Sequence, residues 1–105
     1  MNKTYIASII NRLEEIRQRP MMWIGKLTDI VPFLNGFNSA CFVTVYENTR
    51  DNFYEEIVKG RGWHVSSQGP EFFMREKGLN DKEIADELLA IHIEVWKKRY
   101  DNINS

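Results

Sequence analysis

The pattern of apolar and polar positions predicts a long amphipathic helix near each end of the chain. In residues 4–18, apolar side chains recur every three or four residues and share one helix face; they are Ile6, Ile9, Ile10, Leu13 and Ile16. In residues 80–100 the same spacing is formed by Ile84, Leu88, Ile91 and Val95, widened by Leu89 and Trp96. Asn80 and Glu83 have the spacing of a capping box, which indicates where this second helix begins.

A third helix is expected in the middle of the chain. Apolar positions step by three or four from Val31 to Val45, which predicts a helix from a Thr28 N-cap to about residue 48. The β-branched and aromatic run at 42–46 leaves a strand as the alternative for that segment.

Two shorter helices complete the prediction. Residues 53–60 are expected to form one with Gly60 as its C-cap. Residues 70–78 are expected to form one short helix or 3₁₀ turn that opens with Pro70 and closes on Gly78. The chain, residues 1–105, is therefore predicted to be all-α: a compact single domain of four to five helices. Residues 102–105 are expected to be a frayed tail.

The segment "IRQRPMMWIG", residues 16–25, separates the first helix from the next. Pro20 should end the first helix, because the residue before a proline is disfavoured in the α region. Met21, Met22 and Trp23 then supply apolar bulk, and Gly25 lets the chain turn. We expect a helix–helix corner packed into the core, with Trp23 largely buried.

Composition and charge narrow the class of protein. The net charge of −1 argues against general nucleic-acid binding, which requires a basic excess. Cys41 is the one cysteine, so no internal disulfide can form, and its apolar neighbours predict an inert core thiol. No apolar run has membrane-spanning length, and Asn11, Arg12 and Glu14 interrupt the apolar residues near the N-terminus, unlike a signal peptide. We therefore expect a cytoplasmic protein that does not contact membranes.

The residues offer little for catalysis, and we expect a protein that is not an enzyme. His92 is expected to be a structural histidine at the apolar edge of the last helix, while His64 follows Trp63 in a turn-rich segment without a matched partner. No zinc spacing or phosphate-binding glycine loop is present, so neither a metal nor a cofactor is expected.

An acidic row is the candidate partner-binding site. Glu47, Asp51 and Glu55 are four residues apart, with Glu56 beside them, and would share a face of a continuous helix. Like charges at this spacing repel mildly, so the fold gains nothing from them, whereas a protein partner could. Tyr54 is the candidate aromatic anchor of this set. A solvated polar face is the alternative interpretation.

Two resemblances add to this interpretation. "RPMMWIG" is similar to "RPGMYIG", a loop in the ATP-binding domain of type II DNA topoisomerases, although Met21 stands where that loop has glycine. Over residues 10–96 the chain resembles bacterial immunity proteins of contact-dependent growth inhibition and related polymorphic toxin systems. The resemblance lies in the Arg-Pro-x-Met-aromatic-Ile-Gly corner, the following helix with Gly36-Phe37, a Gly-Trp pair and a final capped helix.

The second resemblance implies a cytoplasmic, non-catalytic antitoxin that binds the C-terminal domain of one cognate toxin, often a nuclease of the tRNase or RNase type. It would neutralise the toxin by blocking its active site, and the carboxylates could imitate RNA phosphates in a basic cleft.

Three alternatives stay open. One is a small regulatory or adaptor module that binds another protein. A second is a nucleic-acid-binding domain that uses a basic edge formed by Arg12, Arg17, Arg19 and Lys26. The third, an enzyme, would depend on His64.

Overall fold

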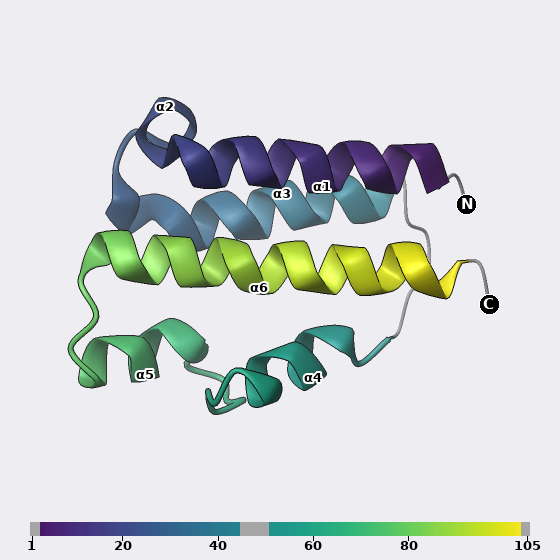
Figure 1. Cartoon of the computed structure of the whole chain (residues 1–105). Helices are drawn as coiled ribbons and strands as arrows, with labels where there is room; N and C mark the ends of the chain where they lie inside the picture. Colours follow the sequence, from purple (N-terminus) through teal and green to yellow (C-terminus); the bar gives the residue numbers. More distant parts are fainter. Residues whose placement is uncertain (1–2, 45–50, 104–105) are drawn as a thin grey trace.

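Helix α6 (Asp81–Asn102) runs through the middle of the molecule, with helices on both of its sides (Figure 1). The computed structural model describes residues 3–44 and 51–103, and the side chains in these ranges except at 42–44. The radius of gyration is 13.6 Å, close to the roughly 13 Å of a folded domain of this length. The all-α fold is confirmed, since no strand occurs among the described residues.

The start of α6 has the capping box that the sequence predicts. The Asn80 side chain accepts a hydrogen bond from the Glu83 backbone N–H at 2.9 Å, and a Glu83 carboxylate oxygen accepts from the Asn80 N–H at 3.0 Å. The predicted apolar stripe is buried along the helix: Ile84, Leu88, Leu89, Ile91, Val95 and Trp96. A single helix therefore supplies much of the core.

Helix α1 (Lys3–Gln18) lies antiparallel to α6, and α3 (Ile30–Thr44) lies beside it on the same side (Figure 1). The predicted face of α1 is buried at Ile6, Ile9, Leu13 and Ile16. Helix α3 buries Ile30, Leu34 and Cys41, so the prediction of a core thiol is confirmed. The backbone at 42–44 is helical and not a strand, because the helical period that starts at Val31 continues through it. Residues 45–46 lie outside the described part.

Helices α4 (Phe53–Gly60) and α5 (Pro70–Glu76) cover the other side of α6 (Figure 1). Arg61 joins this layer to α6: its guanidinium donates to both carboxylate oxygens of Glu87, at 2.8 and 2.6 Å, and also pairs with Glu94. The Trp63 indole N–H donates to Glu87 at 2.9 Å. The layer is thus attached through polar contacts as well as through buried Val58 and Met74.

Three predicted element ends differ from the structure. Thr28 is not an N-cap, because it lies inside a 3₁₀ turn, η1 (Leu27–Asp29), that leads directly into α3. Gly60 is the last residue of α4 and not its cap, because the chain turns at Gly62, whose φ is +88°. The predicted tail, residues 102–105, begins inside the last helix, because α6 includes Asn102 and Ile103 packs against the core; residues 104–105 lie outside the described part.

The structure differs most from the sequence prediction at residues 16–25, the expected helix–helix corner. Residues Pro20–Ile24 form a separate helical turn, α2, which brings the described α-helices to six. Pro20 starts this turn, and Gly25, at φ +81°, ends it. Ile24 packs against the core, whereas the methionines and the tryptophan face outward. Trp23 is 39% exposed and Met22 73%, so the expected burial of Trp23 is wrong.

Candidate functional site

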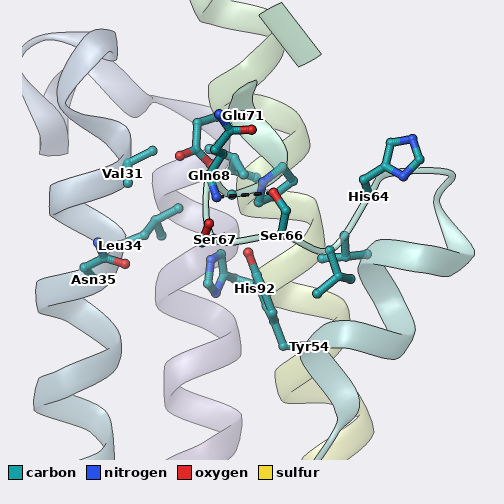
Figure 2. Close-up of a pocket in the computed structure, with 15 residues that line it drawn as sticks. Val31, Leu34, Asn35, Tyr54, His64, Ser66, Ser67, Gln68, Glu71 and His92 are labelled. Carbon is teal, nitrogen blue, oxygen red and sulfur yellow. Dashed lines mark hydrogen bonds between the residues drawn. The ribbon is translucent and has the colours of Figure 1, made fainter. Parts of the chain in front are cut away.

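A pocket of about 360 Å³ lies between α3, the α4–α5 layer and α6 (Figure 2). Its inner wall is apolar and includes Val31, Leu34, Val58 and Leu88. The segment between α4 and α5 supplies polar side chains at Ser66, Ser67 and Gln68. The remaining lining residues are Asn35, Tyr54, His64, Val65, Gly69, Pro70, Glu71 and His92. The volume is at the lower end of small-ligand sites, roughly 300–1,000 Å³.

His92 is held in a defined neutral state at the inner end of this pocket. The Trp96 indole N–H donates to Oδ1 of Asn38 at 3.4 Å, which leaves the Asn38 amide nitrogen to donate to Nδ1 of His92 at 3.1 Å. Burial, with a smaller contribution from the positive charge of Arg99, lowers the pKa of His92 to about 4. At neutral pH the imidazole therefore carries its proton on Nε2, and the expectation of a structural histidine agrees with this geometry.

Tyr54 and Glu71 are two further polar residues of the pocket: Tyr54 lies against His92, and Glu71 lies at the end near Gln68 (Figure 2). The Tyr54 ring is tilted against the His92 ring, with centroids 5.6 Å apart. Burial and the negative charge of Glu71 both raise the pKa of Tyr54, which keeps its hydroxyl protonated. Figure 2 shows the Tyr54 hydroxyl directed toward the segment that carries Ser66 and Ser67.

The backbone at Gly69 makes room for the Glu71 carboxylate. Gly69 has φ +77°, and a Cβ there would lie 2.5 Å from a carboxylate oxygen of Glu71. The Gly69 N–H donates to the Ser66 carbonyl at 3.2 Å, and Pro70 behind it is buried. The loop therefore places a half-buried carboxylate at the pocket, beside the start of α5.

The predicted acidic set does not lie on one exposed face. Glu47 falls outside the described residues. Asp51 is largely buried and pairs with Arg99 at 2.9 and 3.2 Å, and Glu56 pairs with Lys98. Glu55 is exposed on α4, while Tyr54 turns inward to the pocket. The structure therefore brings Tyr54 to the pocket and gives Asp51 a partner inside the fold.

Helix α2 presents the other unusual surface. All five of its residues are apolar, and none is buried. We call Met21, Met22 and Trp23 the α2 surface; their exposed fractions are 58%, 73% and 39%. The guanidinium of Arg12 lies 4.8 Å from the centre of the Trp23 ring.

The basic edge suggested by the sequence is partly neutralised. Arg17 forms a bidentate pair with Asp86 at 2.8 and 3.1 Å, and Arg12 lies 3.7 Å from Glu15. Arg19 and Lys26 are exposed on either side of α2. The remaining positive charge thus flanks the α2 surface.

Sequence reasoning missed the pocket because its residues come from distant segments. His64 and His92 are 28 residues apart in the sequence, and no local pattern distinguishes Glu71 from the other carboxylates. The signal available was the turn-rich segment 60–70, which carries the polar residues that end up opposite α3.

Within the described residues, no helix combines the length and apolarity needed to cross a membrane. The same residues hold no group of three or more histidine, cysteine, aspartate or glutamate side chains placed to share a metal ion. No protein-family model, curated protein or solved structure matches the chain.

Proposed function

We propose that this chain is a cytoplasmic immunity protein that binds a toxin C-terminal domain through the α2 surface and neutralises it without catalysis. The observation that carries the proposal is the exposure of Met21, Met22 and Trp23 on a helix with no buried residue. The toxin class, a nuclease blocked at its active site, comes from the resemblance in residues 10–96.

The chemistry of the α2 surface suits a protein partner. Contiguous exposed apolar side chains mark interaction sites more often than they serve the isolated fold. Tryptophan is among the commonest anchors at interfaces, and methionine adapts to irregular partner surfaces. Arg12 over the Trp23 ring limits the motion of that anchor before binding.

The positive charge around the α2 surface indicates which charge the partner should carry around its binding site. Arg19 and Lys26 are exposed beside α2, and Arg12 lies on Trp23. A partner with an apolar cavity and carboxylates around it would complement this arrangement. Charged residues at the rim of an interface mainly affect the association rate and its dependence on salt, while the apolar centre mainly determines the dissociation rate.

The test first looks for a toxin C-terminal domain encoded next to this chain, which the proposal requires. The chain is then co-expressed with that domain in cells that the toxin alone kills. Trp23→Ala and Met22→Asp are expected to weaken the complex by about 30-fold or more, as loss of an interface anchor does, and to abolish protection. Tyr5→Asp is the matched control, since Tyr5 is 56% exposed on α1. The thermal unfolding midpoint of each variant shows whether the fold is intact. If both α2 variants protect as well as the unchanged chain, the proposal is wrong.

The partner-binding site predicted from the sequence, the acidic row Glu47, Asp51, Glu55 and Glu56 with Tyr54, stays a prediction beside the α2 surface. Glu55→Lys tests it best, because Glu55 is exposed, whereas reversal of Asp51 would also break its pair with Arg99. A Glu55→Lys chain that binds the toxin domain as tightly as the unchanged chain would remove this region from the interface.

A further inference from the structure

We propose that the pocket between α3, α4, α5 and α6 binds a cation carried on an alkyl stem, a guanidinium or ammonium group that lies against the Glu71 carboxylate. This pocket shares no lining residue with the α2 surface, and binding of such a cation requires no toxin partner.

The charge of the pocket selects a cation. Among the described residues that line it, Glu71 is the one aspartate, glutamate, lysine or arginine. Glu71 is half-buried, and within the described part of the chain no lysine or arginine lies at ion-pair distance from it. A partly desolvated carboxylate gains free energy when a positive group takes the place of lost water.

The neutral state of His92 is compatible with that cation. Its Nδ1 accepts from Asn38, so the ring carries no positive charge that would repel a ligand next to Glu71. The adjacent Tyr54 offers a ring face and a hydroxyl oxygen that can accept a hydrogen bond, both favourable toward a guanidinium or ammonium group.

The shape of the pocket suits the stem. Val31, Leu34, Val58 and Leu88 provide an apolar wall that an alkyl chain can cover. Ser66 and Gln68 at the segment between α4 and α5 can hydrogen-bond to the polar end of the ligand. Figure 2 shows Val31 and Leu34 on one side of the pocket, Ser66, Gln68 and Glu71 along the segment that leads into α5, and His92 below them.

The test is an NMR titration of the full chain with butylguanidinium. Saturable shifts are expected at the Gly69 amide and at the side chains of Tyr54 and His92. Butylurea, which has the same shape without the charge, should bind about tenfold more weakly. Equal binding of the two compounds, or no saturable shift with butylguanidinium, would overturn the proposal.

Variants on one helix separate charge at the pocket from charge nearby. Glu71→Gln is expected to weaken butylguanidinium binding about tenfold, whereas Glu76→Gln, exposed at the far end of α5, should leave it unchanged. Gly69→Ala should also weaken binding, because its methyl group displaces the Glu71 carboxylate. Undiminished binding by Glu71→Gln would contradict the assignment.

A further arm identifies the source of the cation. Nα-acetylarginine amide that binds as tightly as butylguanidinium would indicate an arginine side chain of a protein, while much weaker binding would indicate a free small cation. Met22→Asp should leave butylguanidinium binding unchanged, so failure of the α2 proposal and failure of this one give different results.

Discussion

His92 shows how the burial of one side chain makes the stability of the fold depend on pH. Its pKa of about 4 is lower than the roughly 6.5 of an unfolded histidine, so between these values the unfolded chain binds more protons. Stability contributed by neutral His92 is complete above pH 6.5 and is lost as pH falls toward 4. Asp86 and Glu87 have pKa values below their ordinary 3.8 and 4.5, so their contributions are lost only at lower pH.

We predict that the free energy of unfolding falls by about 2 kcal/mol between pH 8 and pH 5 because of His92. Urea unfolding at both pH values measures the change. His92→Gln should be less stable at pH 8, but its stability should change much less between the two pH values. A variant with the same pH dependence as the unchanged chain would show that His92 does not titrate in this way.

Asp51 shows why composition alone misjudges a carboxylate. In the sequence it belongs to an acidic row that has no evident use in the fold. In the structure its side chain is 13% exposed and pairs with Arg99, which is 8% exposed and comes from the end of α6, 48 residues further along the chain. No local pattern specifies that pairing, because it depends on how α6 passes the start of α4.

Helix ends provide a matched comparison at the scale of single elements. Asn80 caps α6 with a side-chain hydrogen bond, whereas Asn52, at the same position before α4, makes no capping bond. Asn80→Ala is therefore expected to lower the free energy of unfolding by about 1 kcal/mol, and Asn52→Ala by a few tenths. Chemical denaturation of the two variants measures both. Equal effects would mean that the capping bond does not contribute.

The sequence predicts best those helices in which the apolar spacing continues over many residues and the first residue is marked by a capping pattern. Helices α1 and α6 were predicted from apolar stripes, and the start of α6 from Asn80 and Glu83. Helix α2 is not predictable in this way, because its five residues are too few to show a helical spacing of apolar positions. All five residues of "PMMWI" are apolar, so the sequence does not show which side chains face the core and which face the solvent. The pocket was missed for a related reason, since its walls come from four helices and a loop that only the tertiary fold brings together.

The attachment of the α4–α5 layer to α6 is a property of the whole molecule. Glu87 accepts hydrogen bonds from Arg61 and from Trp63, and its pairing with Arg61 lowers the pKa of Glu87 below its ordinary value. On the opposite side of α6, Asp86 pairs with Arg17 at the end of α1, where both side chains are more exposed. The two neighbouring carboxylates thus join α6 to different layers.

We predict that Glu87→Gln lowers the free energy of unfolding by about 1.5 kcal/mol and loosens the α4–α5 layer preferentially. Hydrogen exchange should become faster at α4 amides while the middle of α1 keeps its protection. Asp86→Asn is the control, and its more exposed pair should contribute less than about 1 kcal/mol. If Glu87→Gln speeds exchange equally in every helix, the layers do not open independently.

The central place of α6 also sets an order of events during synthesis. A ribosome releases α1 to α5 before α6, yet both layers bury their apolar faces against that last helix (Figure 1). The emerging chain therefore exposes the isoleucines of α1 to the solvent until residues 81–102 follow. Closing the core therefore requires contacts between segments that are far apart in the sequence, and such non-local contacts slow folding.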